Sequence, residues 1–575
     1  MIEPKKAIKQ IEPYEVPLFA EHYALKIDAN ENVFGCSPKV IERLKNITTE
    51  DISRYPHYGA VTQKIAEYLN VSTDEIKVTD GADEALAALI QTYCDTDDVM
   101  LTVTPSFSMP KLYANSAGAK VVELDYKKRW EFPTEDFLKE IETNPKIKVV
   151  HLTSPNNPTG ECISEETAER ILKAAQDKLV IFDETYGGYS GKSMISRVKD
   201  YENLAVVKSF SKDFALAGLR IGYIVTNSER IKLLKTVISP YSVNSLAAIA
   251  AEAALSDLEH FERVKAEIQK SKEILTNGFK NLGLRVYPSE ANFVLINADE
   301  KADFVYLTLL KNGIKVRKYS NKSMNGLLRI TMPQVEKAEK IIELLQPKPT
   351  LIFDMDGVLA DVSNSYRTTI KKTYEYFSGK EMSYDRISEA KNSGGLNNDW
   401  DLTEFLLNSD GITVERQKLV EVFEKIYFGD GNGLINQEDF LADRKFFEEL
   451  SKKYNLAIFT GRPRVEAVYT LKKENAAEFF YPIITMDDLP KDRQKPDSLG
   501  IEIIKNKILT TDEIFYFGDT SDDMKCGKSA NVKAIGVLPP QDKSPEMSAR
   551  LLENGADRVL TTVTDFTHTE EKILK

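Results

Sequence analysis

Short apolar runs alternate with helical patterns through the first part of the chain. Buried strands are expected at 148–154, 178–184 and 205–211, and each is followed by a segment with helical periodicity. Strands that alternate with helices usually pair in parallel. The pattern therefore predicts an α/β fold with a mainly parallel sheet.

A second set of apolar runs lies at 351–356, 456–461 and 514–519. Each run ends in a polar residue at the point where the strand meets its loop. Open α/β sheets bind ligands at these carboxyl ends. Residues 363–442, between the first two runs, have a largely helical pattern.

The boundary between the two parts is expected at about residue 348. Residues 336–346 form an amphipathic helical pattern, and Pro347 and Pro349 cannot continue it. We therefore expect two domains, 1–348 and 349–575.

Composition narrows the class of protein. The 575 residues are 42% hydrophobic and 29% charged, enough for several buried cores, and the net charge of −13 disfavours a nucleic-acid partner. The first residues contain no apolar signal segment, and no run of about 18 apolar residues predicts a membrane span. The four cysteines have no metal-type spacing, which favours a reducing, cytoplasmic location.

The segment from Ser209 to Arg220 carries the first candidate chemistry. A lysine just past a buried strand, here Lys212, can lose its proton and form an imine with an aldehyde, and Arg220 offers a planar fork suited to phosphate. Taken alone, the pair also fits a surface lysine and a structural arginine. Three more segments, 154–160, 183–186 and 81–84, end strands or open a helix whose free N–H groups can hold phosphate. Helix caps and turns alone do not easily explain all four segments.

These segments resemble the fold-type I aminotransferases, and most closely the histidinol-phosphate aminotransferases, over residues 10–346. The resemblance rests on 30–35 (NENVFG), 54–56 (RYP), 154–160 (SPNNPTG), 183–186 (DETY), 209–220 (SFSKDFALAGLR) and 286–293 (VYPSEANF). It implies a large domain with a mainly parallel sheet, a small α/β domain and the cofactor pyridoxal 5′-phosphate.

The resemblance also implies roles for single residues. Lys212 would bind the cofactor aldehyde and then move the substrate proton, and Asp183 would pair with the ring nitrogen. Further cofactor contacts are implied for Ala82, Asp83, Phe107, Asn157, Tyr186, Ser209, Ser211 and Arg220. Tyr55 resembles a residue that reaches the cofactor phosphate of a second subunit, which implies a homodimer.

Three residues are implied on the substrate side. Arg329 resembles the arginine that binds a carboxylate, Arg317 stands where a substrate phosphate is bound, and Tyr14 matches a tyrosine near the N-terminus. The position of Arg317 is also typical of a solvent-exposed residue at the end of a strand. Val33 departs from the family, which usually has proline there.

The second half of the chain carries a different pair of carboxylates. Asp354 and Asp356 follow an apolar strand, where one could attack phosphorus and the other handle the leaving-group proton. This spacing also occurs in calcium loops, but no glutamate closes a 12-residue loop here. With Asp519 and Asp523 they would supply oxygen ligands for Mg²⁺, and Lys495 would add positive charge beside a phosphoryl group.

This half resembles the haloacid-dehalogenase superfamily over residues 350–575. The resemblance implies a Rossmann-like core with a helical cap at about 363–442. It makes Asp354 the nucleophile that forms an aspartyl-phosphate and Asp356 the acid and base. Thr460 and Lys495 would hold the phosphate, and an aspartate at position 356 favours phosphate-ester hydrolysis over the other reactions of the superfamily.

Together the resemblances imply a two-enzyme chain. The first half would interconvert imidazole-acetol phosphate and histidinol phosphate with glutamate and 2-oxoglutarate, and the second would release phosphate from histidinol phosphate. Three alternatives remain. One keeps both chemistries on another amino-alcohol phosphate such as serinol phosphate. Another joins a general amino-acid transaminase to a phosphatase of unrelated substrate, and the last makes the second half only regulatory.

Overall fold

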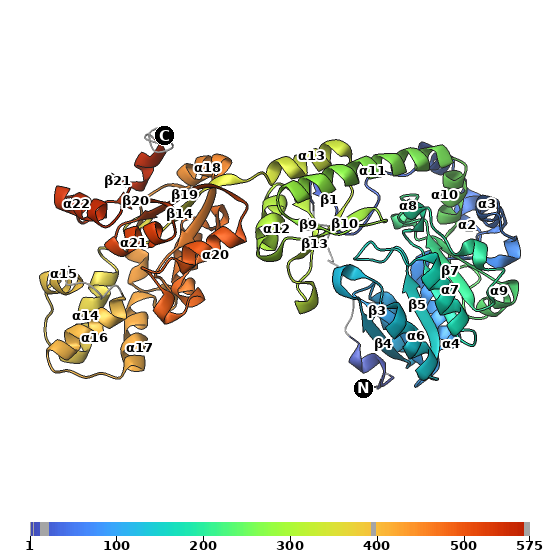
Figure 1. Cartoon of the computed structure of the whole chain (residues 1–575), viewed down its shortest axis with the longest axis horizontal. Coiled ribbons are helices and arrows are strands. Elements are labelled where there is room, and N and C mark those ends of the chain that lie inside the picture. Colours follow the sequence, from blue (N-terminus) through green and yellow to red (C-terminus); the bar gives the residue numbers. More distant parts are fainter. Residues whose placement is uncertain (1, 4, 12–21, 393–397, 568–575) are drawn as a thin grey trace. The chain divides into compact units, whose positions relative to one another are not determined.

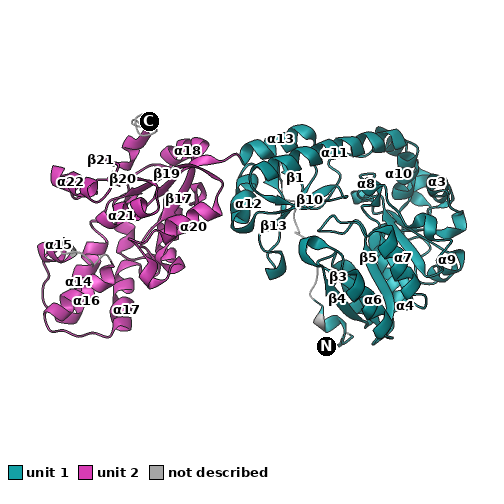
Figure 2. Cartoon of the chain, in the orientation of Figure 1, with its two compact units in different colours: residues 1–345 teal, residues 346–575 magenta. Residues whose placement is uncertain are grey.

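The computed structural model describes residues 2–3, 5–11, 22–392 and 398–567 (Figure 1). The chain divides into two compact units, residues 1–345 and 346–575 (Figure 2). The division lies close to the junction expected from the sequence. It follows α13 (Val335–Leu344), and β14 (Lys348–Phe353) opens the second unit.

The first unit is built on a seven-stranded sheet. Its order is β2 (Ile76–Thr79), β8 (Gly222–Thr226), β7 (Leu204–Ser209), β6 (Leu179–Asp183), β5 (Ile147–Thr153), β3 (Val99–Thr104) and β4 (Lys120–Asp125). Only β8 runs opposite to the other six strands. The expected mainly parallel sheet is therefore confirmed.

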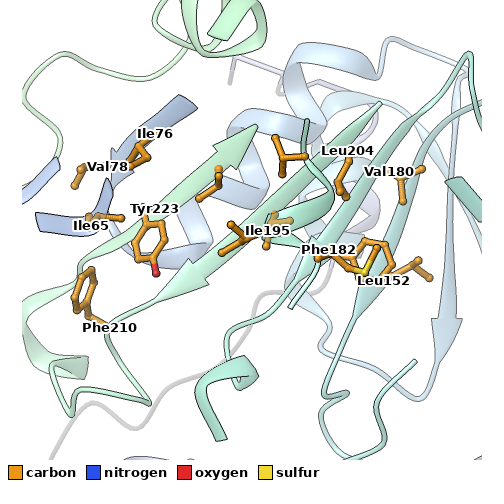
Figure 3. Close-up of a cluster of buried hydrophobic side chains, with 14 of the residues drawn as sticks. Ile65, Ile76, Val78, Leu152, Val180, Phe182, Ile195, Leu204, Phe210 and Tyr223 are labelled. Carbon is orange, nitrogen blue, oxygen red and sulfur yellow. The ribbon is translucent and has the colours of Figure 1, made fainter. Parts of the chain in front are cut away.

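Apolar residues on both sides of each central strand explain why this sheet is buried. In β6, Val180 and Phe182 point into one core cluster, shown in Figure 3, while Leu179 and Ile181 point into another. Successive side chains of a strand alternate between faces, so a continuous apolar run needs cover on both. Helices supply it, among them α4 (Gly81–Tyr93), α5 (Met109–Ala117), α6 (Thr134–Thr143), α7 (Glu165–Ala174) and α10 (Ser245–Leu255).

A smaller domain completes the first unit. Its antiparallel sheet has the order β12 (Arg317–Lys318), β13 (Leu327–Thr331), β10 (Phe293–Asn297) and β9 (Arg285–Val286), and α11 (Leu258–Asn281), α12 (Ala302–Lys311) and α13 are its helices. Gly278 lets α11 and α13 approach closely, because a Cβ there would overlap Ile342. A short parallel pair, β1 (Leu25–Lys26) and β11 (Ile314–Lys315), lies beside it.

The second unit is a six-stranded parallel sheet with a helical cap. The order is β18 (Phe480–Ile484), β17 (Asn455–Phe459), β14, β19 (Thr510–Gly518), β20 (Lys533–Val537) and β21 (Arg558–Leu560). The chain starts in the middle at β14, builds one side and then crosses to β19. The carboxyl ends of β14 and β19 therefore form a switch point, where such sheets bind ligands.

The cap contains α14 (Tyr366–Ser378), α15 (Tyr384–Asn392), α16 (Asp399–Ser409) and α17 (Arg416–Tyr427) and has its own hydrophobic core. A short antiparallel pair, β15 (Ala360–Asp361) and β16 (Asp439–Phe440), joins the segments that leave for the cap and return from it. Across the described ranges of both units, no helix is long and apolar enough to cross a membrane.

Phe353→Ala tests whether the two units have separate cores. Phe353 is 1% exposed and stacks on Phe517 at 4.8 Å. Its loss should lower the free energy of unfolding of the second unit by about 3–5 kcal/mol. Each unit holds one of the two tryptophans, Trp130 or Trp400, so urea unfolding can be followed by fluorescence in Trp400→Phe and Trp130→Phe backgrounds. An equal shift of the Trp130 transition would show that the units share one cooperative core.

Candidate active sites

The carboxyl ends of β5, β6 and β7 bring the first set of predicted residues together. Asn157 lies in the loop after β5, Asp183 ends β6, and Lys212 follows β7 by three residues. They line one cavity of about 730 Å³. The same cavity is lined by Ala82, Asp83, Phe107, Tyr186, Ser209, Ser211, Arg220, Arg317 and Arg329.

One end of the cavity suits a phosphate group. The N-terminus of α4 begins at Gly81, and Arg220 donates to Asp83 at 2.9 Å and to Ser211 Oγ at 3.4 Å. Gly81 has φ +70°, and a Cβ there would lie 2.7 Å from Arg220 Nη2. The start of α4 therefore contacts Arg220 through backbone atoms alone. Backbone N–H groups and a guanidinium are then both available to bind an anion.

Lys212, in the same cavity, is less exposed than Arg220. Its Nζ donates to the carbonyl oxygen of Ala29 at 2.8 Å. Burial, and then the nearby charges of Arg329 and Arg220, lower its pKa from 10.5 to about 8. A sizeable fraction of the amine is then uncharged near neutral pH and can react with a carbonyl group.

Asp183 is a buried carboxylate whose negative charge is stabilised by few neighbouring groups. It accepts a hydrogen bond from the backbone N–H of Thr185 at 3.0 Å. Burial raises its pKa to about 6, although the bonds from Thr185 oppose the rise. A protonated ring nitrogen beside it would supply the missing positive charge, so Asp183 fits its expected role.

Two arginines that line the cavity lie in register on neighbouring strands. Arg317 of β12 pairs directly with Arg329 of β13. Arg329 is 7% exposed, donates to Asp28 O at 2.5 Å and to Asn157 Oδ1, and lies over the Phe293 ring. Arg317 is exposed. Like charges opposite each other on paired strands are unfavourable, so an anion between them would be stabilising.

Three predicted contacts stay predictions. Asn157, expected to contact the cofactor, lines the cavity, and its Oδ1 accepts a hydrogen bond from Arg329. Tyr55 is 73% exposed, stacks on Tyr241 at 4.4 Å and is absent from the cavity lining, so its role across a dimer stays a prediction. Tyr14 lies outside the described residues.

Two features of this cavity were missed. Asn30 is fully buried and donates to Tyr186 Oη at 2.9 Å, although the sequence had singled it out only as part of a motif. Burial raises the pKa of this tyrosine to about 12. Lys26 and Lys315, in register on β1 and β11, also line the cavity. Strands of two residues are too short for periodicity to reveal.

In the second unit, three carboxylates meet at the switch point. Asp354 follows β14, Asp519 follows β19, and Asp523 lies in the first turn of α21 (Ser521–Ser529). One oxygen from each lies within 4.8 Å of the others. Gly357, at φ +70°, makes room for them, because a Cβ there would overlap the Asp519 carboxylate.

Lys495 partly balances this negative charge. Its Nζ lies 2.8 Å from Asp354 Oδ1 and 2.9 Å from Asp523 Oδ1. Burial alone would lower the pKa of Lys495, but the two carboxylates raise it above its usual value. Burial, followed by Asp523 and Asp356, still raises the pKa of Asp354 to about 7. The three carboxylates thus exceed the one cation, and their oxygens fit a hard divalent ion such as Mg²⁺.

Asp356 departs from the expected set of metal ligands. Its side chain is not in the group of three, and its Oδ1 instead accepts from Arg462 Nε at 2.5 Å. Thr460 follows β17 and is 1% exposed, and its Oγ1 accepts from the backbone N–H of Arg462 at 3.2 Å. The sequence analysis assigned no role to Arg462.

Known protein families match both units. The model of the aminotransferase class I and II family matches residues 24–345, more than half of the chain. The chain belongs to the class I and II aminotransferases. The model of haloacid dehalogenase-like hydrolases matches residues 351–537, so both resemblances seen in the sequence, and the enzymatic nature of both units, are confirmed.

Several known proteins are similar to the aminotransferase unit in sequence or in fold. A histidinol-phosphate aminotransferase of Caldanaerobacter subterraneus is 35% identical over 346 residues, covering 60% of this chain and 97% of its own. The crystal structure of the histidinol-phosphate aminotransferase from Clostridium acetobutylicum matches with a TM-score of 0.52 at 26% identity, covering 56% of this chain and 98% of its own. A third relative, from Sinorhizobium meliloti in complex with pyridoxal-5′-phosphate, shares the fold with a TM-score of 0.55 at 22% identity, covering 60% of this chain and 98% of its own.

The titration of Lys212 tests the geometry of the aminotransferase site. Labelling with limiting acetic anhydride, read by peptide mass spectrometry, should give Lys212 a midpoint near pH 8, because burial and two arginines disfavour its charge. Exposed Lys232, whose pKa Glu229 raises above 10.5, is the internal control. Arg329→Gln should raise the midpoint of Lys212. The same pH midpoint of labelling for Lys212 as for Lys232 would contradict the account.

Proposed function

We propose that the aminotransferase unit binds pyridoxal phosphate and transfers the amino group of glutamate to imidazole-acetol phosphate, which gives 2-oxoglutarate and histidinol phosphate. The observation that carries this proposal is a single cavity that holds the Lys212 amine, the buried Asp183 carboxylate and the phosphate-binding end at Arg220. These are the three groups that an aldehyde, a ring nitrogen and a phosphate on one cofactor require.

When bound, the cofactor supplies an electron sink for the carbanion that forms at the substrate carbon. Lys212 binds the aldehyde and, once released, carries the proton to and from that carbon. Asp183 keeps a proton on the ring nitrogen, and Phe107 covers a face of the ring. The remaining contacts come from Ala82, Asp83, Asn157, Tyr186, Ser209, Ser211 and Arg220.

The substrate assignment rests on the paired arginines and on the relatives. Arg329 would bind the carboxylate of glutamate, and Arg317 would bind a substrate phosphate at the exposed side of the cavity. A planar guanidinium suits both groups. Relatives 33% and 35% identical to the unit are histidinol-phosphate aminotransferases.

We infer that the second unit hydrolyses a phosphate ester, with Mg²⁺ held by Asp354, Asp519 and Asp523. The metal would neutralise charge on the phosphoryl group. Asp354 attacks phosphorus while Asp356 protonates the leaving oxygen, and water then attacks the aspartyl-phosphate as Asp356 takes its proton. Thr460 and Lys495 hold the phosphoryl oxygens.

Histidinol phosphate is the substrate we propose for this second reaction. It is the product of the proposed transamination, so the two units would perform successive steps. Asp354, Asp356, Lys495 and Asp519 are all retained, which disfavours a purely regulatory second unit. We also propose a homodimer through the face that carries the exposed, stacked Tyr55 and Tyr241.

A substrate panel tests both activities. Phosphate release with Mg²⁺ should favour histidinol phosphate over serinol phosphate, phosphoserine and glycerol phosphate by at least about tenfold in kcat/KM, a difference of about 1.4 kcal/mol. Asp354→Asn should abolish phosphate release and spare transamination. Lys212→Ala should remove the visible absorbance of bound cofactor and transamination, and spare phosphate release.

Each outcome bears on a separate part of the proposal. Preference for serinol phosphate would move the chain to another amino-alcohol phosphate and leave both mechanisms in place. Persistent phosphate release by Asp354→Asn would contradict the nucleophile, and unchanged visible absorbance of Lys212→Ala would contradict the cofactor site.

A further inference from the structure

Arg462 is a fully buried cation that the proposed reaction does not use. The exposed fraction of its side chain is 0%. Nε donates to Asp356 Oδ1 at 2.5 Å, Nη1 lies 2.9 Å from Glu438 Oε2, and Nη1 also donates to Thr470 Oγ1 at 3.1 Å. One guanidinium therefore joins a residue of the β14 loop to a residue of the segment that returns from the cap.

Glu438 collects the connections to the cap. Its Oε1 accepts from Ser365 Oγ at 2.8 Å and from Tyr427 Oη at 2.7 Å. Ser365 immediately precedes α14, Tyr427 ends α17, and Glu438 immediately precedes β16. The start of the cap, its last long helix and its return segment thus meet at one carboxylate.

Only two of the carboxyl groups described in this cluster balance the positive charge of Arg462. A third carboxyl group, Glu466, accepts from Tyr366 Oη at 2.7 Å. Burial, and then Glu424, raise the pKa of Glu466 to about 9, so it is neutral at pH 7. Asp356 and Glu438 then share the charge of Arg462, and loss of either would leave a buried charge with less compensation.

We propose that Arg462 is a positioning residue that couples the cap to Asp356, and that Glu438 is the cap's end of this link. The inference rests on the proposed phosphatase function. Because Nε holds Oδ1, the proton for catalysis is carried on Oδ2. In the first step the bond between Asp354 and phosphorus forms, the phosphorus–oxygen bond of the ester breaks, and the Oδ2 proton passes to the leaving oxygen.

The planar fork of arginine is essential to this role. Its Nε and Nη1 contact two carboxylates at once, whereas the single ammonium of a lysine has neither the reach nor the fixed geometry. Arg462→Lys should therefore keep a positive charge near Asp356 and lose its orientation. Glu438→Gln should keep the size of the side chain and lose the ion pair with Arg462.

Leaving-group dependence separates a positioning role from a purely structural one. The alkoxide of an alkyl phosphate needs a proton in order to leave. The p-nitrophenolate group of p-nitrophenyl phosphate leaves readily without one. Arg462→Lys and Glu438→Gln should each lower kcat for histidinol phosphate by roughly 100-fold, the scale of a general acid's contribution. For p-nitrophenyl phosphate we expect a loss of less than about fivefold, and Asp356→Asn should show the same selectivity.

Arg464→Lys is the matched control, two residues further on at the start of α19 (Arg464–Lys473). Arg464 contacts Asp488 and the carbonyl oxygen of Ile483, so its change should not alter the ratio of the two rates. Equal losses on both substrates, or an unchanged ratio in either Arg462→Lys or Glu438→Gln, would overturn the coupling. A wild-type chain that hydrolyses neither ester would instead refute the proposed phosphatase, and the inference with it.

Discussion

Desolvation of charged groups at the carboxyl ends of parallel strands is the constraint on which both sites depend. A buried sheet places the ends of its strands where water is scarce, so an ionisable side chain there is costly to charge without a partner. Asp183 and Lys212 show this in the first unit, and Asp354 shows it in the second. In each case the shifted pKa suits the proposed reaction.

The two units meet this constraint in different ways. The cavity of the aminotransferase gathers several cations around a few carboxylates, which suits an anionic cofactor and anionic substrates. The switch point of the second unit gathers three carboxylates around Lys495, which suits a divalent cation. A chain with net charge −13 can therefore still offer a site for anions, because positive charge is concentrated at the aminotransferase cavity.

Local sequence was enough to predict the central strands and most of the residues that follow them. Apolar runs such as 178–184 are long enough to show a buried strand, and polar residues at their ends mark a site. The partners of those residues could not be predicted, because they are distant in the chain. Asn30 contacts Tyr186 across 156 positions, and Arg462 contacts Asp356 across 106. Such pairings depend on tertiary packing, which no local pattern encodes.

The central claim is that one chain performs two successive reactions, and a single product analysis tests it most directly. The full chain would be incubated with imidazole-acetol phosphate, glutamate, pyridoxal phosphate and Mg²⁺, and the products followed over time. The account predicts 2-oxoglutarate, histidinol and phosphate in equal final amounts. Formation of 2-oxoglutarate with histidinol phosphate as the lasting product would contradict the claim, because the second unit would then act on something else.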